Sequence, residues 1–285
     1  MIGGGFLRGK VSVIFGPPGN AKSFFAMNLV TEYMKYENGV KCAYLPMEYS
    51  KLDHVKRAMA VHANSWRVVS ESRTEDKQSV LDWLMNTDGV VDYLSGLDKC
   101  ILDNPGLGKM NSDGNILIPS VDFPKIFDIV ARESADKDFI IIDPITSIDP
   151  DDKSRLNEWE QQKMFVKQLG VIAEHNDCHI MMLSHSNKRG KHKGNETKLT
   201  MDDLAGSSAL SRFVQYMLII DYHDEKKSMC SVGHGNEYFD HTRTMIIAKT
   251  NFGTGKGCRL AMDFSDTGPE MEIYGMIVKD DEAMG

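Results

Sequence analysis

The chain has 285 residues, of which 41% are hydrophobic and 26% charged, an ordinary globular composition that excludes wholesale disorder, a collagen-like fibre and a coiled coil. Its 33 basic and 41 acidic side chains give a net charge of −8, so any nucleic-acid binding requires a local basic surface. The longest apolar runs are far too short to cross a bilayer, and no membrane partner is expected.

The first 50 residues predict a strand, a loop, a helix and a second strand. Residues 11–15 form a β-rich apolar run that ends at a glycine- and proline-rich loop. Apolar residues then recur near a 3.6-residue period from 23 to 34, which predicts a helix. A second short strand is expected over 40–46, and it places Glu48 just past its end.

The middle of the chain mixes helical patterns with short buried strands. Three stretches have a helical pattern: 52–63, 80–84 and 122–135. The piece 104–120 is rich in Gly, Asn and Pro and predicts a loop or a hairpin. Residues 139–143, FIIID, are typical of a buried parallel strand. A long helix is expected over 158–176 and another buried strand over 179–183.

The last third predicts more strands. They are expected over 217–221, 244–249 and 259–264, with antiparallel pairing near the end. Strands that alternate with helices predict an α/β fold with a mainly parallel sheet flanked by helices. Because no repeat or clean linker interrupts the chain, we expect one domain over 1–285, with residues 265–285 as a C-terminal extension.

A phosphate-binding loop follows the first strand. It reads Gly16, Pro17, Pro18, Gly19, Asn20, Ala21, Lys22 and Ser23, which fits GxxxxGK[ST] except that Ala21 replaces the second glycine. Backbone N–H groups and the following helix N-terminus make an anion site for a triphosphate, Lys22 reaches the terminal phosphates, and the Ser23 hydroxyl binds Mg²⁺. The alternative is a glycine-rich turn with a chance Lys-Ser. The methyl group of Ala21 is expected to be tolerated if its φ is negative.

Two carboxylates are expected beside this loop. Asp143 ends the FIIID strand, the Walker B pattern, which places a magnesium-linked carboxylate at the C-terminal edge of the sheet. Glu48 follows the neighbouring strand, where it can orient and deprotonate the attacking water. The alternatives are a buried strand that simply ends in Asp, and a solvated Glu before a helix.

Several motifs in a fixed order resemble a known family. They are GGGFLRGK, the phosphate loop, YLPMEYS, FIIIDPITSI, MMLSHSNKRG, LAGSSALSRF and IIAKTNFGTG. Together they resemble the RecA-type ATPase domain of ring-shaped replicative helicases, above all the DnaB-like and phage helicase-primase group. The resemblance covers residues 3–264 and implies a RecA-like P-loop NTPase fold.

The resemblance also implies roles for single residues. Glu48 matches the family's catalytic glutamate, Asp143 its Walker B aspartate, and His185 the polar residue that senses the γ-phosphate. The alternative for His185 is an ordinary loop histidine. The DNA-binding loop of the family corresponds to a segment with the basic residues Lys188, Arg189, Lys191, Lys193 and Lys198, whose alternative is a solvated basic loop.

One departure from the family concerns its Lys-x-Arg pair, which reaches the neighbouring subunit's nucleotide. Here Lys249 is kept, but Asn251 stands in the arginine position. Since an arginine finger is worth orders of magnitude in turnover, either Lys249 works alone, Arg243 or Arg259 substitutes, or hydrolysis is slow.

The function implied by the resemblance is an ATP-hydrolysing DNA helicase or translocase. We expect it to form a ring, with a hexamer as the expected size, on single-stranded DNA, with a primase or other replication proteins as partners, in the cytoplasm. Two alternatives stay open. One is a RecA-like recombinase or strand-annealing ATPase, and the other is a DNA-independent oligomeric regulatory ATPase.

Overall fold

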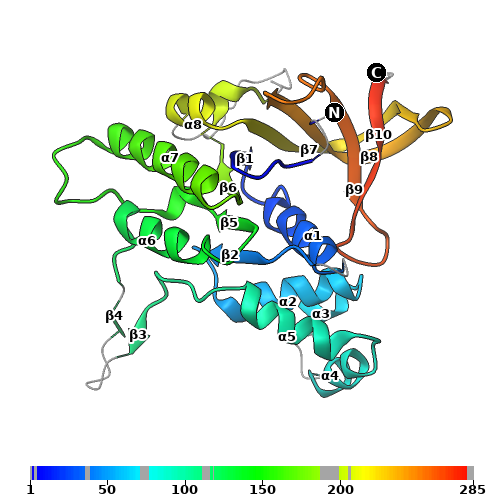
Figure 1. Cartoon of the computed structure of the whole chain (residues 1–285). Coiled ribbons are helices and arrows are strands. Elements are labelled where there is room, and N and C mark those ends of the chain that lie inside the picture. The colour runs from blue at the N-terminus through cyan, green and yellow to red at the C-terminus, as the bar shows by residue number, and fades with distance from the viewer. Residues whose placement is uncertain are drawn as a thin grey trace.

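The fold is taken from a computed structural model of the whole chain (Figure 1). It describes residues 2, 5–35, 39–70, 77–110, 116–117, 119–186, 199–204 and 207–280. No helix within these ranges is long and apolar enough to cross a membrane.

One sheet of eight strands organises these residues, in the order β10-β9-β8-β7-β1-β6-β5-β2. Its parallel part consists of β2 (Cys42–Pro46), β5 (Phe139–Asp143), β6 (His179–His185), β1 (Lys10–Gly16) and the start of β7 (Tyr216–Val232). The antiparallel part adds β8 (Gly235–Thr250), β9 (Arg259–Phe264) and β10 (Met271–Asp280). The predicted α/β fold is therefore confirmed, antiparallel strands near the C-terminus included.

Helices cover both faces of the parallel strands, and the alternation of side chains along each strand explains why. In β1, Val11, Val13 and Phe15 belong to one buried cluster, while Ile14 belongs to the other. The first cluster is completed by α6 (Phe123–Glu133) and α7 (Glu158–His175). The second contains α1 (Lys22–Lys35), α2 (Lys51–His62) and α5 (Val90–Cys100). Both faces are buried, as a parallel sheet requires.

Short elements complete the architecture. They are α3 (Arg67–Ser70), α4 (Lys77–Met85), α8 (Ser207–Phe213), and the two-stranded hairpin of β3 (Lys109–Met110) and β4 (Ile116–Leu117). This hairpin lies inside the stretch 104–120, where a loop or hairpin is predicted. The helix α5 was not predicted, although its Tyr93, Leu97 and Cys100 recur at helical spacing and are buried.

The antiparallel strands are much longer than predicted. Strands expected over 217–221 and 244–249 extend to 17 and 16 residues, because β7 and β8 continue as a ribbon in which polar and apolar residues are mixed and no apolar run marks a strand. The strand β10 pairs with β9 and with the far half of β7, so β7, β8, β9 and β10 form a closed circuit of pairs. Residues 271–280 of the expected C-terminal extension thus add a strand to the sheet.

Candidate functional site

The residues expected to act on a nucleotide meet at the carboxyl edge of the parallel strands. The phosphate loop joins the end of β1 to the start of α1, Glu48 follows β2, Asp143 ends β5 and His185 ends β6. Parallel strands end at the same edge, so their four ends converge there. A cavity of about 210 Å³ lies between them, lined by residues 18–24, Glu48, Tyr49, Arg57, Asp143 and His185. We call this cavity the phosphate-loop pocket.

The loop backbone adopts conformations that only some residues tolerate. Gly19 has φ +82°, in the left-handed region. A Cβ on Gly16 would lie 2.2 Å from the carbonyl oxygen of Ile220, so a side chain there is excluded. Ala21 has φ +65°, which is unusual for an alanine. The expectation that the methyl group is accommodated at negative φ is therefore wrong, and Ala21 holds a strained conformation that its glycine counterpart would adopt freely.

The ammonium group of Lys22 is folded onto the loop. Its Nζ donates to the carbonyl oxygens of Gly16 (2.9 Å) and Pro17 (2.8 Å), and the side chain is buried. Burial lowers the pKa of Lys22 to about 8, against the opposing attraction of Asp143 and Glu48. Among the loop residues, Asn20 is also buried, and its Nδ2 donates to the Ile220 carbonyl at 3.2 Å. This bond ties the loop to β7.

Asp143 lies at the base of the pocket with two hydroxyl groups. Tyr44 donates a hydrogen bond to its carboxylate, and the Ser23 hydroxyl is also hydrogen-bonded to it. Burial raises the pKa of Asp143, while the bonds from Ser23 and Tyr44 oppose the rise. A carboxylate beside a serine hydroxyl is a donor set that suits Mg²⁺, which prefers oxygen ligands and takes its remaining ligands from phosphate and water. Ser23 and Asp143 therefore fit the metal expected of a phosphate loop.

Glu48 is half-exposed at the mouth of the pocket and has two neighbours. Its Oε1 accepts a hydrogen bond from Ser147 Oγ at 3.3 Å and lies 3.1 Å from Nε2 of His185. A carboxylate that faces a cavity and is held by two polar groups has a fixed direction, as a general base requires. The contact also joins the ends of β2 and β6, which are separated by β5 in the sheet.

Several residues of the site were not predicted from the sequence. Arg57 of α2 lines the pocket, with its guanidinium 4.3 Å from the ring centre of Tyr49. Tyr44 and Ser147 hold Asp143 and Glu48. No pattern in the sequence indicates Arg57, because its place depends on the direction in which α2 leaves the sheet.

Other expected residues lie elsewhere. Lys249 pairs with Met217 at the start of β7, the edge opposite the phosphate loop, and its Nζ donates to the carbonyls of Ser211 (2.9 Å) and Val214 (2.7 Å). Arg243 forms an ion pair with Asp263. The described residues that line the phosphate-loop pocket do not include Lys249, Arg243 or Arg259.

The basic residues expected to contact DNA fall within 187–198. Lys188, Arg189, Lys191, Lys193 and Lys198 therefore lie outside the described residues. The segment begins two residues after His185, at the carboxyl edge of the sheet. In the described part of the chain, no group of three or more His, Cys, Asp and Glu side chains could hold a metal.

The fold and the pocket define a class: a phosphate loop between β1 and α1, with carboxylates at the ends of two neighbouring parallel strands, is the arrangement of ATPase domains of the RecA-like kind. The AAA domain family model matches residues 1–191, and the chain belongs to this family. All of the pocket residues named above lie in the matched part. No curated protein matches the chain.

Solved structures with the same fold include helicase domains and a recombinase. One helicase ATPase domain aligns with a TM-score of 0.65 and 17% identity, over 94% of this chain and 85% of that one. A DnaB-like replicative helicase, described with its interactions with primase, aligns with a TM-score of 0.66 and 18% identity. The alignment covers 94% of this chain and 58% of that one. The RadB recombinase aligns with a TM-score of 0.51 and 15% identity, over 95% of this chain and 93% of that one. At these identities the likeness establishes the fold.

Proposed function

We propose that this chain is an oligomeric ATPase that moves along single-stranded DNA as a cytoplasmic helicase or translocase in replication. The observation that carries the proposal is the 3.1 Å contact between Glu48 and His185. It joins the expected catalytic carboxylate to the strand whose last residue, His185, precedes the basic segment 188–198 by three positions. A change at the γ-phosphate can thereby reach a segment whose positive charge suits DNA phosphates.

The residues of the pocket divide the work of hydrolysis. The loop amides and the start of α1 bind the phosphates, and Lys22 exchanges its two carbonyl partners for phosphate oxygens. Ser23 and Asp143 would hold Mg²⁺, which would offset the negative charge of the phosphates. Glu48 orients a water molecule and accepts its proton, while Ser147 fixes the carboxylate. His185 senses whether the γ-phosphate is present.

Assembly into a ring, with a hexamer as the expected size, is part of the same proposal. Lys249 lies at the opposite edge of the sheet from its own phosphate loop, so it can contribute only to the nucleotide of another subunit. We propose one ATPase domain over residues 1–285. The core expected over 3–264 is extended by β10, which pairs with β9 and β7. The DnaB-like helicase that shares the fold is described with a primase, which makes a primase or another replication protein a reasonable partner to test.

A recombinase or strand-annealing ATPase is the second candidate. The likeness to the RadB recombinase spans 93% of that chain, whereas the DnaB-like helicase extends well beyond the part shared with this one. The third candidate, a regulatory ATPase that does not use DNA, needs the same pocket but not the basic segment.

One experiment separates the three. ATP hydrolysis is measured with and without single-stranded poly(dT), and the assembly is examined by native mass spectrometry and electron microscopy with a non-hydrolysable ATP analogue. If the chain is a helicase or translocase, we expect DNA to stimulate hydrolysis and closed rings to unwind forked duplexes with one polarity. Helical filaments with strand exchange would identify a recombinase, and hydrolysis indifferent to DNA would identify the regulator. Hydrolysis undiminished in Lys22→Ala would contradict the ATPase site itself.

A further inference from the structure

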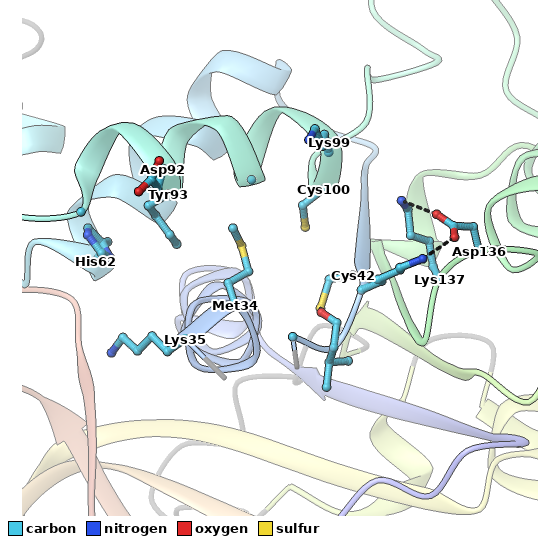
Figure 2. A pocket seen from close by; sticks show the side chains of 15 residues that line it. Met34, Lys35, Cys42, His62, Asp92, Tyr93, Lys99, Cys100, Asp136 and Lys137 are labelled. Carbon is cyan, nitrogen blue, oxygen red and sulfur yellow. Dashed lines mark hydrogen bonds and ion pairs between the residues drawn. The ribbon is translucent and has the colours of Figure 1, made fainter. Parts of the chain in front are cut away.

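A second cavity lies at the amino edge of the sheet, away from the phosphate-loop pocket. Its volume of about 560 Å³ is in the range of small-molecule sites, and it is bordered by the end of α1, by α5 and by the residues that precede β2 and β5 (Figure 2). Its lining contains none of the residues of the phosphate-loop pocket. We call it the lysine-rimmed pocket.

The inner wall of this pocket is apolar and aromatic. Met34, Cys42 and Cys100 face it together with Tyr93. Burial raises the pKa of the Cys42 thiol, and it raises that of Cys100 to about 12, so both thiols stay protonated and act as small apolar groups. This wall suits the body of an organic ligand and not a metal ion.

One end of the pocket offers a flat aromatic surface. The ring of His62 stacks on that of Tyr93, with centroids 4.1 Å apart and planes inclined by 11°. The Tyr93 hydroxyl is fixed by a 2.6 Å hydrogen bond with Thr31. Burial also lowers the pKa of His62, so this end carries a neutral ring at pH 7. A planar ligand can pack against the fixed pair.

The other end is cationic, although the whole protein is acidic. Lys41 and Lys137 share the carboxylate of Asp136, at 2.6 and 3.4 Å. Asp138, which is itself paired with Arg8, is the other carboxylate that acts on Lys41. Lys99 at the end of α5 is exposed and has no carboxylate within ion-pair distance among the described residues. Among the described lining residues there are four lysines and two aspartates, and one of these lysines, Lys35, is paired with Glu32 outside the lining at 2.6 Å.

We propose that the lysine-rimmed pocket binds a small organic anion with a planar aromatic body, its anionic group between Lys99 and the Lys41–Lys137 pair and its ring against Tyr93 and His62. An aryl carboxylate and a nucleoside monophosphate both have this chemistry. The site is independent of the proposed DNA motor, since it uses no residue of the phosphate-loop pocket.

Two variants test whether the ligand binds in the lysine-rimmed pocket, one by filling the pocket and one by changing its charge. Gly96 of α5 carries no side chain, and a Cβ there would lie 2.4 Å from Cε of Met34, so Gly96→Leu fills the pocket. Lys99→Glu reverses the charge of an exposed residue and leaves the apolar wall intact. Their matched controls are on α7, which covers the other face of the sheet. Gly170→Leu enters open space there, and Lys167→Glu changes an exposed lysine.

The probe is 8-anilinonaphthalene-1-sulfonate, an aromatic anion whose fluorescence reports binding, titrated into the full-length protein. We expect one molecule per chain at this site, lost in Gly96→Leu and weakened about threefold to tenfold in Lys99→Glu, with both α7 controls unchanged. A melting curve like that of the parent protein shows that each variant is folded. Equal binding by the parent, Gly96→Leu and Lys99→Glu would overturn the proposal.

Competition with unlabelled anions identifies the chemical class of the ligand. Only the part of the signal that Gly96→Leu removes is followed, because nucleotides can also enter the phosphate-loop pocket. Displacement by AMP assigns the site to nucleoside phosphates, and displacement by indole-3-acetate assigns it to aryl carboxylates. Adenosine, which lacks the charge, should displace at least about threefold less well than AMP if AMP binds. Displacement by neither anion, or by adenosine as well as by AMP, would overturn the anionic assignment. Because ATP hydrolysis is not the readout, failure here leaves the proposed motor function untouched, and the reverse also holds.

Discussion

At the scale of single residues, the charge of Lys22 decides when the pocket can bind a polyanion. Because burial lowers its pKa to about 8, the ammonium form is present below that pH and is lost as the pH rises through it. Phosphate binding favours the protonated form. The affinity for a non-hydrolysable ATP analogue should therefore fall between pH 8 and 9.5, by up to about tenfold per unit, since one proton is linked. Titration calorimetry across this range should give a flat profile for Lys22→Ala, and a flat profile for the parent protein would contradict the lowered pKa.

Glu48 carries the second prediction at this scale. Glu48→Gln keeps the size of the side chain and a hydrogen bond to Ser147 but removes the base. ATP should still bind, and turnover should fall by about 10²-fold or more. Steady-state hydrolysis and nucleotide affinity measure the two effects separately. The exposed carboxylate of Glu32 on α1 provides the control, since Glu32→Gln should change neither. Undiminished turnover in Glu48→Gln would move the catalytic role to another carboxylate.

Arg57 is a candidate to supply the positive charge that the family's arginine provides at the position of Asn251. It lines the phosphate-loop pocket of its own chain, and stacking on Tyr49 holds its guanidinium. We expect Arg57→Ala to lower kcat by roughly tenfold to 10³-fold with a smaller effect on KM, because a cation near the γ-phosphate stabilises the transition state. Mixing Arg57→Ala with Lys22→Ala subunits should restore no activity, since neither kind of subunit then has a complete site. Recovery in the mixture would show that Arg57 serves a neighbouring subunit.

At the scale of elements, the circuit of β7, β8, β9 and β10 depends on close backbone approach. Gly275 of β10 faces β7, where a Cβ would lie 2.7 Å from the carbonyl oxygen of Ser231. Gly275→Ala should therefore lower the free energy of unfolding by roughly 1–3 kcal/mol, the usual cost of overpacking. Urea denaturation measures the change. Gly233→Ala, between β7 and β8, enters open space and should stay within about 0.5 kcal/mol of the parent protein. Equal stability of all three proteins would show that β10 is not packed as described.

The helices α1 and α2 act at the same scale as supports of the pocket. The start of α1 carries Lys22 and Ser23, and α2 brings Arg57 back over the phosphate loop. The capping box of Ser50 and Asp53 fixes the first turn of α2 directly after Glu48. Regular elements thus hold three of the side chains on which the proposed chemistry depends.

At the scale of the whole molecule, the proposed motor requires DNA binding to control hydrolysis. Replacing Lys188, Arg189, Lys191 and Lys193 with Ala should leave basal hydrolysis largely intact, because none of them is among the residues expected to bind or hydrolyse the nucleotide. Affinity for single strands should fall, and the slope of its logarithm against that of salt concentration should decrease by about 0.7 per lost phosphate contact. DNA stimulation of hydrolysis should fall with it. Unchanged single-strand binding at every salt concentration would remove the DNA role of this segment.

The sequence by itself determined the parts of this protein that rest on local patterns. The phosphate loop, the FIIID strand with Asp143, and Glu48 just past a strand end were identified from residue types and spacing. His185 was identified from the resemblance to ring-shaped helicases. The rule that parallel strands share a carboxyl edge then predicted their meeting, and the structure brings them around one cavity. The roles of these residues stay predictions.

Only the tertiary structure decided the contacts between residues far apart in sequence. Tyr44 holds Asp143 across 99 positions, and Arg57 reaches the pocket through the path of α2. The positive φ of Ala21 depends on how the whole loop closes. The length of β7 and β8 depends on their pairing with each other, which no apolar run in the sequence indicates. Hydrophobic periodicity records which face of an element is buried, but it does not record which other element lies there, and that pairing set the site and both pockets.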